Sequence, residues 1–144
     1  MATEQLFQIG IKGLIRNLQG KVLLVRLPAW KDNPEPWDLP GGRMEPGENF
    51  QQTLRRELQE EIGVDYAGTP QHLMTVLSTV TIPVATMRVP LVLMAYQVEL
   101  PQGTEITLDP NGPEQEYAWV EPETAAERLQ QKYPQEFCDM LAKL

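Results

Sequence analysis

The sequence predicts a mixed α/β protein in which helices cover a central mixed β-sheet. Apolar runs rich in Val, Ile and Leu precede one strongly patterned helical segment, and similar runs follow it. Two further segments near the C-terminus open with a proline and then repeat apolar residues at helical spacing. Strands on both sides of helices along the chain favour a sheet that is covered by helices.

The first two strands are expected at residues 6–15 and 21–27, where β-branched and other apolar residues cluster. The RNLQG segment between them carries turn residues, so it predicts a short connection. Residues 28–42 are rich in Pro, Asn, Asp and Gly and are expected to form an irregular loop. The apolar anchors of this loop are expected to be Trp30, Trp37 and Leu39.

The clearest element is a helix over residues 50–62. Asn49 can cap its first turn and Gln52 stands three residues later, as in a capping box. Gly63 can adopt the left-handed conformation that closes a helix. The stripe that should face the core consists of Phe50, Leu54, Leu58 and Ile62.

Two longer strands are expected after this helix, at residues 73–82 and 87–99. Val, Ile and Thr are too frequent in these segments for a comfortable helix. Residues 101–115 are expected to be mostly loop, and the EYAWV segment at residues 116–120 is expected to be a short strand.

The chain should end in two helices. Pro122 and Pro134 are each expected in the first turn of one of them, where proline is well tolerated. No internal repeat, low-complexity tract or change of composition marks a boundary. Residues 1–144 are therefore expected to form a single domain.

Charge and composition exclude several classes of function. A net charge of −8 with scattered Lys and Arg argues against a surface that binds nucleic acid. No run of about 18 apolar residues could span a membrane, and the N-terminus lacks the pattern of a signal peptide. We therefore expect no nucleic acid or membrane partner and a cytoplasmic location. The only cysteine, Cys138, is expected to be a buried packing residue.

Three glutamates, Glu57, Glu60 and Glu61, crowd the end of the expected helix. Like charges three and four residues apart repel each other on a helix. At roughly 100° per residue, Glu57 and Glu61 lie at the margin of the apolar stripe, whereas Glu60 lies on the polar side. Two of the three carboxylates are thus expected beside the core rather than opposite it.

Two interpretations of this cluster follow from helix geometry alone. In the first, Glu60 pairs with Arg56 one turn earlier and the other acids reach solvent. In the second, the carboxylates hold a divalent cation such as Mg²⁺, which prefers oxygen ligands and takes further ligands from water and phosphates. The helix by itself leaves both interpretations open.

The spacing around this helix resembles the signature of the Nudix hydrolase family, in its MutT-like form. The pattern is Gly42, five residues, Glu48, seven residues, and then RELQEEIGV from Arg56 to Val64. The neighbouring WDLPGG and the later EYAWV also resemble family features. The resemblance implies an α/β/α sandwich that cleaves a pyrophosphate bond in a nucleoside diphosphate linked to another group, with Mg²⁺ or Mn²⁺ required.

The resemblance also implies roles for particular residues. It makes Glu60, Glu61 and the Gly41 carbonyl metal ligands, and it makes Glu57 either a ligand or the base that activates water. Arg56 would hold the glutamates in place and Glu48 would support the site. A further ligand or base is implied just before the late Trp strand, where the two candidates, left unresolved, are Glu114 and Glu116.

The expected substrate is a small nucleotide, most simply a nucleoside triphosphate such as an oxidised or non-standard one, that is cleaved to monophosphate and pyrophosphate. Arg43 and Arg88 are candidate phosphate contacts, and Trp30 is a candidate for stacking on a base. The alternatives are a pyrophosphatase for ADP-ribose or nucleotide sugars, and a binding or regulatory module that keeps the fold without catalysis. The protein is expected to be a monomer or a homodimer.

Overall fold

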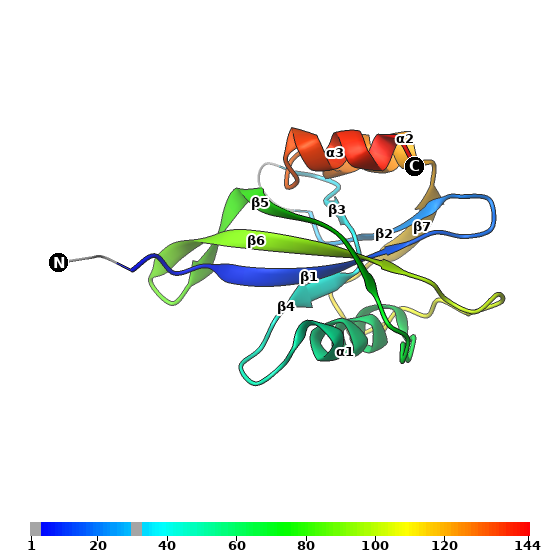
Figure 1. The fold of residues 1–144 in the computed structure, drawn as a ribbon, viewed down its shortest axis with the longest axis horizontal. Helices are drawn as coiled ribbons and strands as arrows, with labels where there is room; N and C mark the ends of the chain where they lie inside the picture. Colours follow the sequence, from blue (N-terminus) through cyan, green and yellow to red (C-terminus); the bar gives the residue numbers. More distant parts are fainter. Residues whose placement is uncertain (1–3, 30–32) are drawn as a thin grey trace.

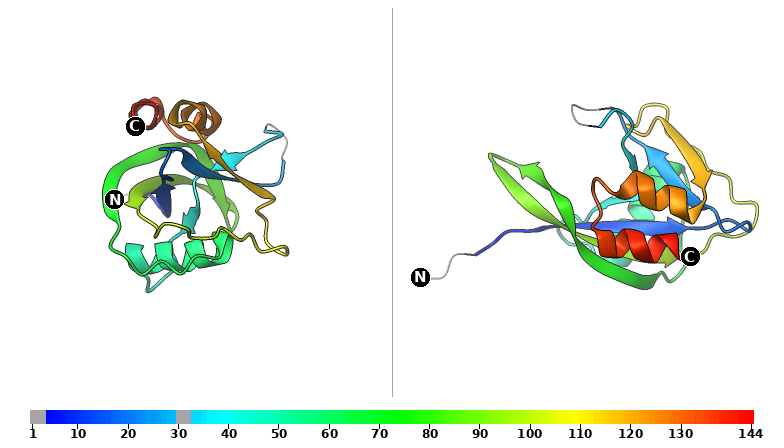
Figure 2. Two further views of the ribbon diagram at one scale, coloured as in Figure 1. Left: turned by 90° about the vertical axis from the view of Figure 1, so that its right-hand side faces the viewer. Right: turned by 90° about the horizontal axis from the view of Figure 1, so that it is seen from above.

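The computed structural model describes residues 4–29 and 33–144 as an α/β/α sandwich. Helix α1 (Phe50–Ile62) covers one side of the β layer, and α2 (Pro122–Leu129) and α3 (Gln135–Ala142) lie together on the other side (Figure 1). The view along the layer in Figure 2 shows the same order of helix, strands and helices. The fold class expected from the sequence is confirmed. In the part of the chain that is described, no helix has the length and apolar character needed to cross a membrane.

The β layer consists of two sheets rather than one. The first has the order β4-β1-β6-β5, and it is mixed because β1 and β6 run parallel while the other neighbours run antiparallel. Its strands are β1 (Gln8–Ile15), β4 (Gly41–Arg43), β5 (Gln71–Val84) and β6 (Met87–Val98). The second sheet is antiparallel with the order β3-β2-β7, and its strands are β2 (Val22–Arg26), β3 (Trp37–Asp38) and β7 (Glu116–Val120).

The strands expected at residues 6–15 and 21–27 are both present as β1 and β2, but they belong to different sheets. The turn at Asn17 joins them, since its side chain accepts hydrogen bonds from the backbone N–H groups of Gln19 and Lys21. Strand β1 then pairs with β6 over its whole length. Strand β1 is buried from Gly10 onward, because α1 and the second sheet cover most of its surface.

The expectation of an irregular loop over residues 28–42 was wrong at its C-terminal end. Trp37 and Asp38 pair with β2, and Gly41 and Gly42 pair with β1. The chain crosses from one sheet to the other between these two short strands. Their pairing depends on distant partners, which here override the loop character of the local composition. Trp30 lies outside the described residues.

Helix α1 has the predicted bounds and caps. The Asn49 side chain accepts a hydrogen bond from the Gln52 N–H, the Gln52 side chain accepts one from the Asn49 N–H, and Gly63 closes the helix with a φ of 68°. The predicted core stripe was wrong at its first position. Phe50 is 36% exposed and stacks on Tyr96 at 4.9 Å between ring centroids, so the first turn packs at the edge of the core.

Strands β5 and β6 form a hairpin in which β5 extends two residues beyond its predicted bounds at each end, whereas β6 ends one residue earlier than predicted. Its outer part contains Pro83 and Pro90, which are tolerated because β5 is an edge strand and the β1–β6 ladder begins only at Leu91. Strand β7 has the predicted bounds, and Pro122 opens α2 as expected. Pro134 is the N-cap of α3 rather than a first-turn residue.

The core has two parts that lie on either side of the β layer. One is centred on α2 and α3 and includes Tyr133, Phe137 and the buried Cys138. The other is centred on Leu54, Leu58 and Ile62 of α1. The carboxylates of α1 emerge from the margin of this second cluster.

Candidate active site

The candidate site begins where β4 packs against α1. The Gly41 N–H donates a hydrogen bond to Glu61 Oε2 at 2.8 Å. Gly41 has a φ of 138°, a conformation that favours glycine, and a Cβ at this position would collide with the Ile11 carbonyl. A Cβ at Gly42 would occupy the space of the Glu57 carboxylate. The two glycines therefore form a cradle that is shaped around two of the three predicted glutamates.

A pocket of about 300 Å³ opens beside this cradle. We call it the glutamate pocket, because Glu57 and Glu61 line it with the backbone of Gly41 and Gly42. Its apolar lining is formed by Leu27, Ile82, Leu91 and Leu93 next to Gly10, and its other charged residues are Arg43, Lys12, Asp38 and Lys132. We call the two glutamates the carboxylate end of the pocket and the group of Lys12, Asp38 and Lys132 its basic end. The two groups meet at Gly41, whose N–H donates to Glu61 and whose carbonyl accepts from Lys12.

Arg56 organises the carboxylates around this pocket. Its Nε and Nη2 donate to the two oxygens of Glu48 at 2.7 and 3.0 Å, and its Nη1 donates to Glu57 Oε1 at 2.8 Å. Its Nη2 also donates to the Arg43 carbonyl at 3.0 Å. The hydrogen bonds from Arg56 and from the Glu45 N–H lower the pKa of Glu48 to about 2. Glu48 is therefore a fixed anion that orients Arg56.

The pKa values of the two pocket glutamates shift in the opposite direction. Burial raises the pKa of Glu61 to about 8, against the opposing effects of Lys12 and of the Gly41 N–H. Burial also raises the pKa of Glu57, although Arg56 opposes the shift. Partial burial therefore disfavours the charged form of both carboxylates, and a further positive charge beside them would stabilise that form.

The donor set at the carboxylate end fits a hard divalent cation. Carboxylate oxygens of Glu57 and Glu61 and the carbonyl of Gly41 are the kind of ligand that Mg²⁺ and Mn²⁺ accept. Glu60 does not join them, because its side chain is 58% exposed and lies 3.4 Å from Arg56 Nη1. Among the described residues, no three acidic, His or Cys side chains converge in the arrangement of a metal site.

The two acids that the sequence left unresolved have different environments. Glu114 is buried, and its charge contributes to the raised pKa of Glu61. Glu116 is exposed on β7 and accepts a hydrogen bond from Arg26 Nε at 2.6 Å. Only Glu114 therefore acts electrostatically on the carboxylate end of the pocket.

The three candidate substrate contacts, Arg43, Arg88 and Trp30, differ in their position relative to the pocket. Arg43 lies at the rim of the glutamate pocket with an exposed side chain. Arg88 lies on the exposed β5–β6 hairpin, where its Nε donates to Thr81 Oγ1 at 2.8 Å, and it does not line the pocket. Trp30 falls outside the described residues.

The basic end of the pocket was not predicted from the sequence. Asp38 is buried, and Lys12 Nζ, Lys132 Nζ and the Tyr133 hydroxyl all donate to its carboxylate. Burial alone would raise the pKa of Asp38, but the two lysines outweigh it and hold that pKa well below its ordinary value. One signal was available in the sequence, since Lys12 interrupts an apolar strand that is buried on both faces. No local pattern in the sequence indicated that Lys132 or Tyr133 would join this network.

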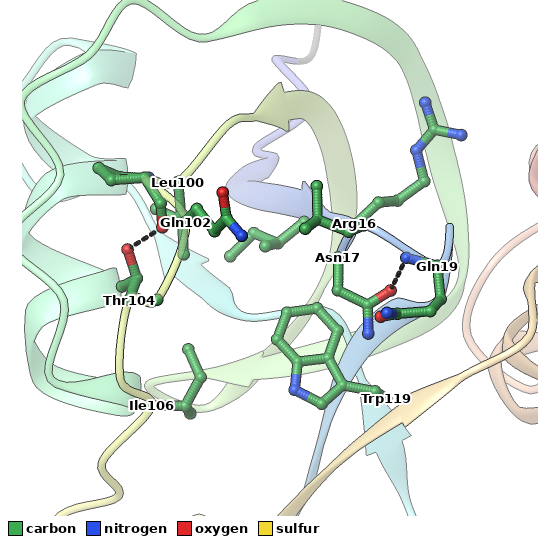
Figure 3. A pocket seen from close by; sticks show the side chains of 12 residues that line it. Arg16, Asn17, Gln19, Leu100, Gln102, Thr104, Ile106 and Trp119 are labelled. Atoms are coloured by element: carbon green, nitrogen blue, oxygen red, sulfur yellow. Dashed lines mark hydrogen bonds between the residues drawn. The ribbon is translucent and has the colours of Figure 1, made fainter.

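A second pocket of about 300 Å³ lies near the turn between β1 and β2 (Figure 3). Leu100 and Ile106 lie on one side of it, and Trp119 lies on the other side next to Asn17 and Gln19. None of the twelve described residues that line it is acidic. Trp119 packs against the core cluster of α1. We therefore assign the candidate active site to the glutamate pocket.

The α/β/α sandwich is the fold that the resemblance of the sequence motif implied. The NUDIX domain model matches residues 6–140 of the chain. The chain therefore belongs to the Nudix family.

Solved structures support the assignment of the fold. A MutT protein from Methanosarcina mazei Go1 superposes with a TM-score of 0.70 at 24% identity, covering 99% of this chain and 95% of that one. The dihydroneopterin triphosphate pyrophosphohydrolase of E. coli also gives a TM-score of 0.70, at 20% identity, and covers 94% of this chain and 92% of its own. At these identities the likeness concerns the fold alone.

Curated relatives match shorter stretches of sequence. The CTP pyrophosphohydrolase of Escherichia coli K12 is 40% identical over 57 residues, which is 40% of this chain and 42% of that protein. The 8-oxo-dGTP diphosphatase of the same strain is 40% identical over 60 residues, 42% of this chain and 43% of its own length. A nucleoside triphosphatase NudI from Escherichia coli O1:K1 is 34% identical over 91 residues, 62% of this chain and 64% of that protein. The matches thus span less than half of the first two relatives.

Proposed function

We propose that this protein is a Mg²⁺-dependent or Mn²⁺-dependent hydrolase that cleaves a pyrophosphate bond in a nucleoside triphosphate, standard or oxidised, and releases a monophosphate and pyrophosphate. The observation that carries the proposal is the glutamate pocket, in which two partly buried carboxylates, those of Glu57 and Glu61, face a glycine cradle and lie next to an open space. The names of the three relatives, all of which refer to nucleoside triphosphates or to CTP, support this substrate class.

In this proposal Glu57, Glu61 and the Gly41 carbonyl hold the metal. Glu60 is included on the resemblance of the motif alone, because its carboxylate lies outside the pocket. When bound, the metal would neutralise charge on the pyrophosphate oxygens and align the phosphate for attack. Arg43 at the rim is the proposed phosphate contact, and Arg88 is no longer favoured for that role because Thr81 engages it away from the pocket.

Hydrolysis also requires a group that takes a proton from the attacking water. Water attacks phosphorus, the bond from phosphorus to the bridging oxygen breaks, and pyrophosphate leaves. We propose Glu114 as the base, because it is buried and its charge reaches Glu61, whereas Glu116 is engaged by Arg26. Arg56 and Glu48 are proposed as positioning residues that fix Glu57.

The test is a panel of nucleotides assayed for release of monophosphate and pyrophosphate. With Mg²⁺ we expect turnover of nucleoside triphosphates, and with excess EDTA we expect none. Glu61→Gln should lower kcat by at least about 100-fold, because it removes a charged metal ligand. The matched control is Glu105→Gln in an exposed loop, which should leave kcat unchanged.

Three other outcomes would contradict the proposal in different ways. Faster cleavage of ADP-ribose or nucleotide sugars than of any triphosphate would favour a nucleotide-sugar pyrophosphatase. Binding of nucleotides without turnover of any substrate would favour a regulatory module. Absence of both turnover and Mg²⁺ binding, the latter measured by calorimetry, would overturn the enzyme proposal altogether.

A further inference from the structure

The basic end of the glutamate pocket is built around the carboxylate of Asp38, whose capacity to accept hydrogen bonds is fully used. Asp38 Oδ1 accepts from the Tyr133 hydroxyl at 2.6 Å and from the Leu39 N–H at 2.8 Å. Asp38 Oδ2 accepts from Lys12 Nζ at 3.1 Å and from Lys132 Nζ. Four donors on two oxygens match the full capacity of an ionised carboxylate. Asp38 therefore cannot accept a hydrogen bond from a ligand unless one of these donors leaves.

The two lysines differ in how many of their N–H donors remain free to bind a ligand. Lys12 Nζ lies within hydrogen-bond distance of Asp38, of the Leu39 carbonyl and of the Gly41 carbonyl, so its three N–H groups have partners. Lys132 Nζ donates to Asp38, and no other acceptor for it is found among the described residues. Its side chain is 29% exposed and lines the pocket. Lys132 thus has donors to spare at the pocket wall.

The position of Lys132 is fixed from two sides. Its carbonyl accepts hydrogen bonds from the Thr79 N–H at 3.0 Å and from Ser78 Oγ at 2.7 Å, which tie its backbone to the edge strand β5. Its ammonium is tied to Asp38 on β3. A donor that is held at both ends loses little conformational freedom when a ligand binds, and it therefore discriminates well between ligands.

From this geometry we infer that Lys132 is a specificity-determining residue, which selects nucleotides whose base presents hydrogen-bond acceptors rather than an amino group. The inference rests on the proposed function, because it assigns the basic end of the glutamate pocket to the base and the carboxylate end to the pyrophosphate. The pocket is also lined by Ile82, Leu91 and Leu93, which form an apolar surface that suits the faces of a planar base.

The chemistry of purines makes the inference specific. Guanine and hypoxanthine carry a keto oxygen beside N7, so this edge presents two adjacent acceptors. Adenine has an amino donor in place of the keto oxygen. That donor would face the Lys132 ammonium, and Asp38 has no free oxygen to receive it. The 6-oxopurine triphosphates are therefore the expected substrate class among purines.

The test compares matched substrates whose phosphates are identical. The values of kcat/KM are measured for inosine and adenosine triphosphates, and for guanosine and 2,6-diaminopurine riboside triphosphates. We expect the wild-type protein to prefer the keto member of each pair by roughly tenfold or more. Lys132→Met should bring the ratio close to one, chiefly by slowing cleavage of the keto substrate, and Lys132→Arg should keep the preference because it retains donors.

Two controls separate specificity from folding. Lys143→Met removes an exposed lysine at the end of α3 and should leave the ratio unchanged. Asp38 keeps three donors in Lys132→Met, so the melting temperature of this variant should stay close to that of the wild type. An equal loss of kcat/KM for the keto and amino substrates would overturn the inference, because it would place Lys132 on the phosphates or in the fold.

A binding measurement distinguishes this inference from the proposed function. Affinities for inosine and adenosine triphosphates are measured by calorimetry in EDTA, where no metal-dependent turnover occurs. Tighter binding of the inosine nucleotide that is lost in Lys132→Met supports the inference even if no hydrolysis is ever observed. Equal affinities, or no binding of either nucleotide, would overturn it, and turnover without base preference would overturn it while leaving the proposed function intact.

Discussion

Arg56 and Arg55 are neighbours in sequence with very different surroundings. Arg56 donates hydrogen bonds to Glu48, to Glu57 and to the Arg43 carbonyl, and its side chain is 23% exposed. Within the part of the chain that the structure describes, Arg55 pairs with Asp65 alone, and both side chains are more than half exposed. Partly buried charge-assisted hydrogen bonds fix geometry, whereas exposed ion pairs contribute little.

Replacement of Arg56 should therefore impair the site more than the fold. We expect Arg56→Ala to lower kcat/KM by about 10- to 100-fold, because Glu57 loses the group that orients it. Arg55→Ala, the matched control, should change kcat/KM by less than about threefold. Initial rates of pyrophosphate release, together with melting curves, check both expectations. Equal losses in the two variants would show that Arg56 has no special role.

The contact between β4 and α1 is the element that shapes the carboxylate end. Helix α1 presents Glu57 and Glu61 at the margin of its buried face, and β4 meets them with two glycines. The absence of a side chain at Gly42 leaves room for the Glu57 carboxylate. The geometry of the site thus depends on how closely a strand and a helix approach each other.

Gly42→Ala tests this close approach. The added Cβ would meet the Glu57 carboxylate, so this side chain must move away from the pocket. We expect kcat to fall by about tenfold or more. Gly13→Ala in β1 is the matched control, since its Cβ would meet Leu54 and Val98 at ordinary contact distances of 3.4 Å. If steady-state rates of the two variants are alike, the cradle does not position Glu57.

At the scale of the whole molecule, Asp38 links parts of the chain that are far apart in sequence. It lies on β3 of the second sheet and binds Lys12 on β1 of the first sheet. It also binds Lys132 and Tyr133, which follow α2 and precede α3. One buried carboxylate therefore joins both sheets to the layer of C-terminal helices.

This network predicts that the stability of the protein depends on Asp38 and on pH. The pKa of Asp38 is lowered in the folded state, so its stabilising effect is complete above the unfolded pKa of about 3.9 and is lost as the pH falls below it. At pH 7, Asp38→Asn should lower the free energy of unfolding by about 3–5 kcal/mol, since it leaves the buried ammonium of Lys12 and the partly buried ammonium of Lys132 without their counter-ion.

Urea unfolding between pH 3 and pH 7 measures this effect. The difference between Asp38→Asn and the wild-type protein should shrink as the pH falls below about 4, because protonation of the unfolded state removes the advantage of the carboxylate. The control is Asp139→Asn on the exposed side of α3, which should be close to the wild type throughout. A difference that is independent of pH would show that Asp38 acts through its shape rather than its charge.

Much of the fold and half of the candidate site could be predicted from local sequence. Helix α1, its caps and its boundary glutamates follow from spacing over a few residues, and β7 follows from a short apolar run. Strands β3 and β4 could not be predicted, because two or three residues carry too little pattern and their pairing partners are distant. Phe50 was misplaced because periodicity gives the direction of a side chain but not where the core ends.

The sequence by itself determined the carboxylate end of the pocket and the family to which the chain belongs. Both depend on residues that lie within 23 positions of each other, where a helix and a turn fix the spacing. Only the tertiary structure decided the basic end, which unites Lys12, Asp38 and Lys132 from three separate regions. Long-range pairing of β-strands and docking of helices bring these charges together, and neither process leaves a local pattern in the sequence.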